Sequence, residues 1–303
     1  MALRKAKRDK LWLKILLNGP SGCGKSYSAL RLATGLQSKV GGEIAFVGTE
    51  SSRDEYYANE FDYMIDSLTE PPYNGVFSIE NYKKAITECI KDGAKIIIID
   101  SLTPEWTWLN QVHSDMRGNS FQNWGKLKPM HNDFMQWILS LPVHIVATAR
   151  GRDEWVMEDE DGKKIPKKTG LGAQQDKDIT YNYTVSFMLD QDTHIAKADK
   201  DNTHIFDQKP RILTEEDGVA LYSWANEGEA PAPTEMPKEI ASQNAVDEIG
   251  EIKKKILVAW NERGGSKNEA IGAVIKKLGN PNAIKTLEQG QEYLTEIEKI
   301  PVK

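Results

Sequence analysis

The octapeptide GPSGCGKS, residues 19–26, is the feature that most constrains the fold of this chain. It matches the pattern G-x-x-x-x-G-K-[ST] in full, follows an apolar run over 11–19 and precedes a helical pattern over 25–38. Glycines in such a loop let backbone N–H groups turn toward phosphate oxygens, and the start of the following helix adds a partial positive charge. The pattern predicts a nucleoside-triphosphate site at a strand–loop–helix junction.

The loop residues have distinct expected contributions. We expect Lys25 to reach the β- and γ-phosphates and the Ser26 hydroxyl to bind Mg²⁺, so ATP and Mg²⁺ are the expected cofactors. Cys23 is expected to be a small filler residue, because two cysteines in the chain are too few for a disulfide framework. The predicted nucleotide-binding residues are Gly19, Pro20, Ser21, Gly22, Cys23, Gly24, Lys25, Ser26 and Tyr27.

Strand-like and helical runs alternate through the first two thirds of the chain. This alternation predicts an α/β fold, with a mostly parallel central sheet and helices on both faces. After the loop helix, strands are expected over 43–49, 94–100 and 143–149, with helices over 79–93 and in the later part of 126–141. Beyond residue 150 we expect a hairpin over 154–168 turning at Asp161-Gly162, strands over 180–190, 193–199 and 203–207, and either a strand or a short helix over 219–225.

Two carboxylates follow predicted strands. Asp100 ends the apolar run AKIIIID, and Glu50 follows the strand EIAFVG. Because ligands bind at the carboxyl ends of parallel strands, we expect Asp100 beside Ser26 as the Mg²⁺ carboxylate and Glu50 as the residue that orients or deprotonates the attacking water. The alternatives are a helix-capping aspartate and an exposed loop glutamate. Many motor proteins place a glutamate directly after this aspartate, whereas Ser101 stands here.

Composition separates the chain into three expected parts. Residues 1–225 form the ATPase core, 226–240 are a linker rich in Pro, Ala and Glu, and 241–303 show apolar residues at helical spacing. Thr286 with Gln289 predicts a capping box for the last helix. The net charge of −6 argues against a uniformly basic, nucleic-acid-coating surface. No apolar run is long enough for a membrane span, and a cytoplasmic location is expected.

The stretches LLNGPSGCGKS, FVGTESS, IIIIDSLT, HIVATARGRDEW, KKTGLGAQQD and KADKDNTHIF resemble a known family. The arrangement of a phosphate loop, a glutamate after the second strand and an aspartate after the third resembles the RecA-like recombinase core. More closely, residues 12 to about 225 are similar to phage-encoded RecA-like ATPases of the Sak-four group of single-strand annealing proteins.

This resemblance implies a Mg²⁺-dependent, DNA-stimulated ATPase that acts in bacteriophage DNA recombination as a homo-oligomeric ring or filament. Thr148 and Arg150 would sense the γ-phosphate, and Lys197 and Lys200 would reach toward a neighbouring subunit's nucleotide. Segments 103–125 and 151–178 would be the two DNA-facing loops. The chain departs from the family at Asn202 and in the Gln-Gln-Asp run at 174–176, where arginines are expected. Because these arginines are missing, we expect either slow ATP turnover or another cationic residue, such as Arg150, Arg152 or Lys197, in the place of the arginine.

Single-stranded DNA is the expected nucleic-acid partner, because such DNA is held by cations and aromatic faces. Tryptophans such as Trp124, within 103–125, could instead belong to the hydrophobic core, and the acidic run 158–161 could neutralise the lysines within 163–168. The candidate DNA-binding residues are Arg117, Trp124, Arg152, Lys163, Lys164, Lys167 and Lys168.

Two other functions stay open on the sequence alone. A small-molecule kinase would use the same loop but should carry a lid with several arginines, and 151–178 contains only Arg152. A nucleotide-gated switch with little turnover would recruit a partner, such as a single-strand-binding or other recombination protein, through 241–303.

Overall fold

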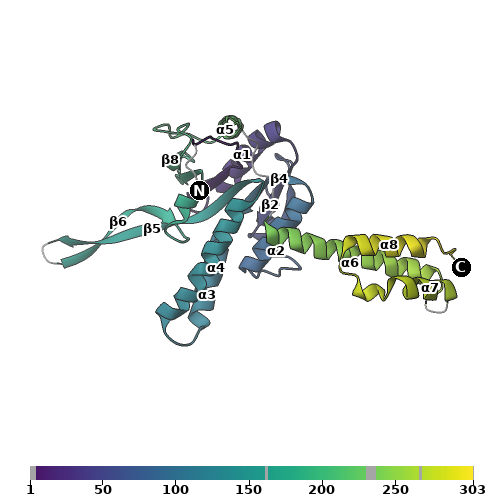
Figure 1. Cartoon of the computed structure of the whole chain (residues 1–303). Helices are drawn as coiled ribbons and strands as arrows, with labels where there is room; N and C mark the ends of the chain where they lie inside the picture. The colour runs from purple at the N-terminus through teal and green to yellow at the C-terminus, as the bar shows by residue number, and fades with distance from the viewer. Residues whose placement is uncertain (1–4, 161–162, 230–236, 266–267, 303) are drawn as a thin grey trace. The chain divides into compact units, whose positions relative to one another are not determined.

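The computed structural model describes residues 5–160, 163–229, 237–265 and 268–302. The chain divides into two compact units, Met1–Glu235 and Met236–Lys303, which we describe separately (Figure 1). Residues 230–236 of the expected linker lie outside the described residues. In the described ranges, no helix combines the length and apolar character needed to cross a bilayer.

The first unit is built on a sheet with strand order β3-β2-β4-β5-β1-β7-β8, with β6 paired to β5 off this path. The neighbours from β3 to β7 are parallel, and β7 with β8 is antiparallel, so the predicted mostly parallel sheet is confirmed. The strands are β1 (Lys14–Gly19), β2 (Glu43–Gly48), β3 (Met64–Ser67), β4 (Ala94–Asp100), β5 (His144–Glu160), β6 (Lys163–Ala173), β7 (Val185–Leu189) and β8 (Ala196–Asp201).

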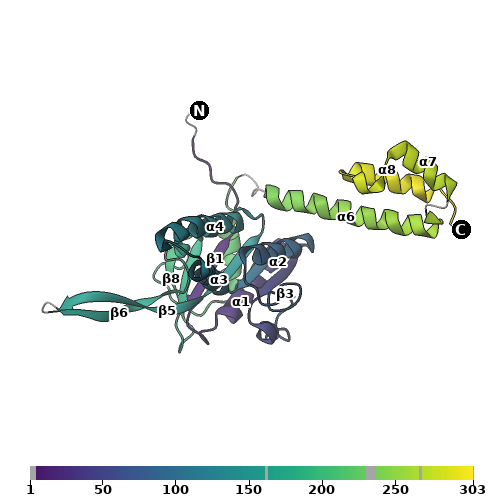
Figure 2. The ribbon, with the colours of Figure 1, turned by 90° about the horizontal axis from the view of Figure 1, so that it is seen from below.

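Helices cover both faces of this sheet, as predicted (Figure 2). Ile15 of β1 packs in one core cluster with Leu30 of α1 and Leu221 of α5. On the other face, the ring of Tyr82 in α2 lies 5.9 Å from that of Phe134 in α4. The helices of this unit are α1 (Lys25–Val40), α2 (Ile79–Lys91), α3 (Thr103–Asp115), α4 (Ser120–Ser140) and α5 (Glu215–Ala225).

The expectation that 103–125 is a loop is wrong, because this segment forms α3 and the start of α4. The α4 helix also begins earlier than expected and contains Pro129. The Asn119 side chain caps it by accepting the N–H groups of Phe121 and Gln122. Proline removes one helical hydrogen bond and crowds the carbonyl group four residues earlier, and burial of side chains such as Phe134 stabilises α4 against that cost.

Residues 203–207 do not form the expected strand. The carboxylate of Asp201 accepts the backbone N–H groups of Thr203 at 2.7 Å and Phe206 at 2.8 Å, so these groups bond locally rather than to a neighbouring strand. The expected strand 180–190 is shortened to β7, and a 3-10 helix, η2 (Ile179–Asn182), precedes it. Residues 219–225 are helical, within α5.

The basic N-terminal segment packs on the end of α5. Lys7 pairs with Glu229 and Arg8 with Glu227, each at 2.8 Å, and the Arg8 guanidinium lies 4.0 Å above the Trp224 ring. These two cations therefore have partners within the chain.

The second unit is helical, as expected, and consists of α6 (Lys238–Glu262), α7 (Glu269–Leu278) and α8 (Leu287–Glu298), with the short 3-10 helix η4 (Pro281–Ala283) between the last two. Ile256, Val274 and Tyr293 meet in its core. The capping box formed by Thr286 and Gln289 is present at the start of α8.

Candidate functional site

The phosphate loop joins β1 to α1 and requires its glycines for steric reasons. A Cβ atom on Gly19 would lie 2.5 Å from the Cys23 sulfur and 2.9 Å from the Leu189 carbonyl oxygen. Gly22 and Gly24 have φ angles of 80° and 86°, in the left-handed region that favours glycine. The loop is therefore a backbone cradle that ends where the helix begins.

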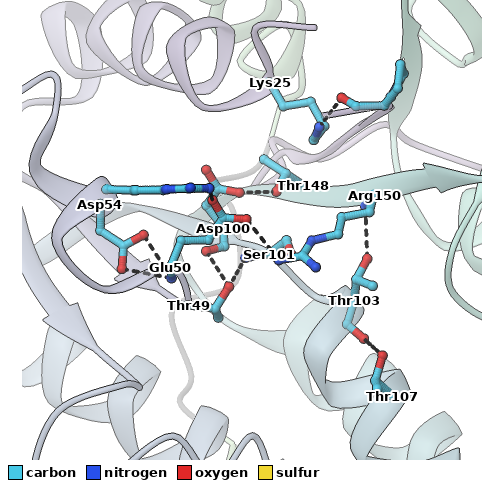
Figure 3. Close-up of polar contacts among 12 residues, drawn as sticks. Lys25, Thr49, Glu50, Asp54, Asp100, Ser101, Thr103, Thr107, Thr148 and Arg150 are labelled. Atoms are coloured by element: carbon cyan, nitrogen blue, oxygen red, sulfur yellow. Dashed lines mark hydrogen bonds and ion pairs between the residues drawn. The ribbon is translucent and has the colours of Figure 1, made fainter. Parts of the chain in front are cut away.

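The Lys25 side chain folds back over this cradle. Its Nζ donates to the carbonyl oxygens of Gly19 at 3.0 Å and Pro20 at 2.7 Å (Figure 3). Cys23 is fully buried beneath the loop, and burial raises the pKa of its thiol. The ammonium thus stands at the loop mouth, and Cys23 acts as filler below it.

Asp100 ends β4 and lies beside Ser26. Its carboxylate accepts the Thr148 hydroxyl at 2.5 Å, and Thr148 itself is fully buried. Burial raises the pKa of Asp100, and hydrogen bonds from the Ser26 and Thr148 hydroxyls oppose that shift. A serine hydroxyl and a carboxylate at the mouth of a phosphate loop are the oxygen ligands that Mg²⁺ prefers.

Glu50 follows β2 by two residues and faces the same space. Its carboxylate accepts from the Arg150 guanidinium at 2.9 Å, and Arg53 lies 3.9 Å away. Arg150 stands on β5, one hundred positions along the chain, and its backbone N–H donates to the Thr103 hydroxyl at 2.8 Å. The two side chains close one wall of the site (Figure 3).

A single pocket of about 990 Å³ connects these groups. Of the residues predicted from sequence, the loop residues Ser21, Gly22 and Gly24 line it. The other predicted residues that line it are Lys25, Ser26, Tyr27, Glu50, Asp100 and Arg150. Gly19, Pro20 and Cys23 shape the loop from behind, and Thr148 acts on Asp100.

Several pocket residues were missed by sequence reasoning. Tyr57 and His194 line the pocket, as do Arg31 and Arg53. The Tyr57 and Tyr27 rings meet edge-to-face with centroids 5.3 Å apart. Arg53 and Tyr57 could have been predicted as pocket residues from the run of polar and aromatic residues after Glu50. No sequence motif around His194 indicates that it lies in the pocket.

Lys197 and Lys200 are not brought to this pocket within one chain. Lys197 is exposed on β8, where it pairs with Met188 in the strand register. The Lys200 ammonium donates to the Tyr181 carbonyl oxygen at 2.6 Å, and burial lowers its pKa. Their expected contact with a neighbouring subunit stays a prediction.

The DNA candidates fall on two projecting elements. In the α3–α4 hairpin Arg117 is exposed, whereas Trp124 stacks between His113 and Trp106, with ring centroids at 4.6 Å and 5.7 Å. Trp124 is thus part of an aromatic stack that holds the two helices together. The remaining candidates are on the β5–β6 ribbon (Figure 1): Arg152, Lys163, Lys164, Lys167 and Lys168.

The β5–β6 ribbon confirms the predicted hairpin, although its turn at Asp161-Gly162 lies outside the described residues. Its register distinguishes two groups of lysines. Lys163 pairs with Glu160 and Lys164 with Asp159, whereas Lys167 pairs with Val156 and Lys168 with Trp155. The acidic run therefore stands opposite only the first two lysines.

Comparison with known proteins gives one family. The model of the AAA_24 family, described as an AAA domain, matches residues 12–213, which is well over half of the chain. No curated protein matches the chain. Among solved structures, a KaiC-like protein of the hyperthermophilic archaeon Pyrococcus horikoshii has a TM-score of 0.36 and 16% sequence identity, over 63% of this chain and 79% of that one.

Proposed function

This chain belongs to the AAA domain family of P-loop ATPases, and we propose that it hydrolyses ATP with Mg²⁺ while acting on single-stranded DNA in recombination, by annealing or strand exchange. The observation that carries the proposal is the convergence of Lys25, Ser26, Glu50, Asp100 and Arg150 on one pocket from separate elements. Such a set supplies phosphate binding, metal binding, water activation and charge stabilisation together.

The pocket fits a nucleoside triphosphate. The loop has room for no side chain at Gly19, and it directs a helix start and the Lys25 ammonium toward one space. Ser26 and Asp100 would hold the Mg²⁺, which neutralises charge on the phosphates when bound. The Tyr57 ring, in edge contact with Tyr27, lines the pocket and offers an aromatic surface for the base.

Hydrolysis needs a carboxylate free to act on water. Glu50 is exposed, and its side chain reaches the pocket beside Asp100. The Glu50 carboxylate is paired with the Arg150 guanidinium, and this pair must open before the carboxylate can act on water. When the guanidinium turns to the γ-phosphate, the carboxylate becomes available to orient water.

The DNA part of the proposal is supported by the base of the β5–β6 ribbon. Gly151 of β5 and Gln174, which directly follows β6, lie at this base, and both line the nucleotide pocket. The Gln174 backbone N–H donates to the Arg150 carbonyl oxygen at 2.5 Å. A strand of DNA held on the ribbon would therefore act on the chain segment that carries Arg150, which links DNA contact to turnover.

A homo-oligomer and a partner for the helical unit are further parts of this proposal. Lys197 is exposed and lies outside its own chain's pocket, as a cation serving a neighbouring subunit must. The helical unit 236–303 carries exposed apolar side chains on α6, Leu257 at 60% and Val258 at 57% exposure, which suit contact with another recombination protein such as a single-strand-binding protein.

One observation favours a second candidate function. The Glu50 carboxylate is engaged by Arg150, so a chain in which this pair persists would bind ATP and turn it over slowly. That behaviour is expected of a nucleotide-gated switch that recruits a partner.

The first experiment is ATP hydrolysis with and without Mg²⁺ and single-stranded DNA, for the wild type, Lys25→Ala and Glu50→Gln. We expect DNA to stimulate turnover, Lys25→Ala to abolish it and Glu50→Gln to leave only a small residual rate. Lys285→Ala, an exposed lysine near the start of α8, is the matched control and should leave turnover unchanged. ATP binding without any response to DNA would support the switch instead.

A further inference from the structure

The residue Asp54 is buried behind the proposed catalytic glutamate. It belongs to the 3-10 helix η1 (Ser51–Glu55), directly after Glu50, and is 5% exposed. Its two carboxylate oxygens accept the backbone N–H of Glu50, at 3.1 Å and 3.2 Å (Figure 3). The Tyr63 hydroxyl donates to the Asp54 carbonyl oxygen at 2.8 Å, which holds the Asp54 backbone in turn.

Gly48 makes the space that Asp54 occupies. A Cβ atom on Gly48 would lie 2.1 Å from a carboxylate oxygen of Asp54 and 2.9 Å from its Cβ atom. Real Cβ atoms do not approach this closely, so any larger residue at the end of β2 would displace Asp54. The position of the Asp54 side chain therefore requires glycine at residue 48.

Thr49 holds the backbone on the other side of Glu50. Its hydroxyl donates to the Asp100 carbonyl oxygen and accepts the Ser101 backbone N–H, both at 3.0 Å. The Thr49 backbone N–H donates to the same Asp100 carbonyl oxygen, also at 3.0 Å. The residue before Glu50 is thus tied to the chain that carries the proposed Mg²⁺ carboxylate.

Asp54 does not itself reach the nucleotide. Its neighbours Arg53, Tyr56 and Tyr57 line the pocket, whereas Asp54 does not. A carboxyl group buried between two other acidic residues is unfavourable, and burial raises its pKa to about 7. A hydrophobic residue would fill the same space without that cost, so the carboxyl group adds its hydrogen bonds with the Glu50 backbone N–H and the Ser67 side chain, and of these only the first reaches the proposed catalytic residue.

We infer that Asp54 is a positioning residue for catalysis: together with Thr49 and Gly48 it fixes the Glu50 backbone against the end of β4, so that the Glu50 carboxylate and Asp100 keep one relative placement during turnover. This inference rests on the proposed ATPase function. Small displacements of a catalytic group reduce rates steeply, about 10²-fold for a shift of 1 Å, so loss of this hold should appear in kcat.

The test measures kcat, KM and the ATP dissociation constant for Asp54→Ala, Asp54→Asn, Glu50→Gln and the double variant Asp54→Ala with Glu50→Gln. We expect Asp54→Ala to lower kcat by roughly 10- to 100-fold while KM and ATP affinity change less than about threefold. Asp54→Asn keeps one acceptor oxygen and should lose less. If Asp54 acts through Glu50 alone, the double variant will be no slower than Glu50→Gln.

Gly48→Ala supplies a second route to the same displacement. It should lower kcat with Asp54 present and have a smaller further effect in the Asp54→Ala background, which removes the contacts with the carboxyl group and leaves only the 2.9 Å contact with the Cβ atom of residue 54. Asp62→Ala, an exposed aspartate seven residues after η1, is the matched control and should leave kcat unchanged. Thermal melting of each variant identifies those that do not fold, and Asp54→Asn and Gly48→Ala then carry the test.

The outcomes separate this inference from the function it rests on. Hydrolysis by the wild type that falls steeply in Glu50→Gln, with kcat unchanged in Asp54→Ala, would overturn the positioning role and leave the ATPase function standing. A further loss in the double variant equal to that of Asp54→Ala alone would show that Asp54 does not act through Glu50. Absence of hydrolysis by the wild type would overturn both proposals.

Discussion

The Glu50 carboxylate and the Arg150 guanidinium meet at 2.9 Å across the nucleotide pocket, although one follows β2 and the other lies in β5. In the sheet, β4 alone separates β2 from β5, so the carboxyl ends of β2 and β5 lie near each other. The pair joins the proposed water-activating group to the proposed γ-phosphate sensor. Its chemistry sets the first prediction.

Replacing Arg150 by alanine should lower kcat for ATP by about 10³-fold, because a cation that stabilises transferring phosphate is worth 10³–10⁵-fold in related chemistry. Arg150→Lys keeps the charge but loses the planar donor fork, and should be intermediate. Steady-state hydrolysis at saturating ATP measures this. A rise in kcat for Arg150→Ala would instead mean that the ion pair restrains Glu50 and that Arg150 adds little in the transition state.

The strand register predicts unequal contributions of the hairpin lysines to DNA binding. Lys167 and Lys168 pair with apolar residues, whereas Lys163 and Lys164 pair with acidic ones. Lys167→Ala with Lys168→Ala should weaken binding to labelled oligo(dT) and reduce the slope of log affinity against log salt by about 1.4, at about 0.7 for each phosphate contact. Fluorescence anisotropy at several salt concentrations measures both quantities.

The paired substitution Lys163→Ala with Lys164→Ala is the control for that experiment, since it removes the same charge from the same ribbon. Equal losses in the two double variants would show that the register does not decide which lysines contact DNA. No loss in either would remove the ribbon from the DNA site.

A buried lysine predicts a pH dependence of stability. Lys14 is 4% exposed, its ammonium donates to the carbonyl oxygens of Leu141 at 2.9 Å and Val143 at 2.6 Å, and burial lowers its pKa to about 7. In the unfolded chain its pKa is near 10.5, so between these values the unfolded state binds more protons. The free energy of unfolding should therefore rise by about 2 kcal/mol from pH 7 to pH 9 through this residue.

Urea unfolding of the wild type and Lys14→Met at pH 7 and pH 9 tests this dependence. The rise should be smaller in Lys14→Met by about that amount, whatever its absolute stability. The same rise in both proteins would mean that Lys14 keeps an ordinary pKa in the folded chain.

Two helical glycines should respond in opposite ways to alanine. A Cβ atom on Gly35 of α1 would lie 2.0 Å from the Glu215 carbonyl oxygen of α5, whereas one on Gly125 of α4 meets nothing within 4 Å. Gly35→Ala should lower the free energy of unfolding by about 1–3 kcal/mol, because the two helices must separate. Gly125→Ala should raise it by about 0.5–1 kcal/mol, since alanine favours the helix. Thermal melting with van't Hoff analysis compares the two.

Sequence alone determined the features whose signals are local. The octapeptide at 19–26 marks the loop because glycine spacing, Lys25 and Ser26 are contiguous, and the apolar run before Asp100 marks a buried strand with a carboxylate at its end. The rule that parallel strands carry ligands at their carboxyl ends then placed Asp100 and Glu50 at one edge. The structure brings both into the pocket with Lys25.

The remaining features depend on contacts between residues distant in sequence, and they become visible only in the folded chain. β3 is a four-residue edge strand with little periodicity, and most of 103–125 is helical because α3 and α4 pack through residues such as Trp106 and Trp124. The pairing of Glu50 with Arg150 joins residues one hundred positions apart. The fit of Asp54 against Gly48 needs a turn whose geometry is set by β2 and Tyr63. Each of these features depends on which surfaces pack together in the folded chain, and the spacing of residues along the sequence does not predict that packing.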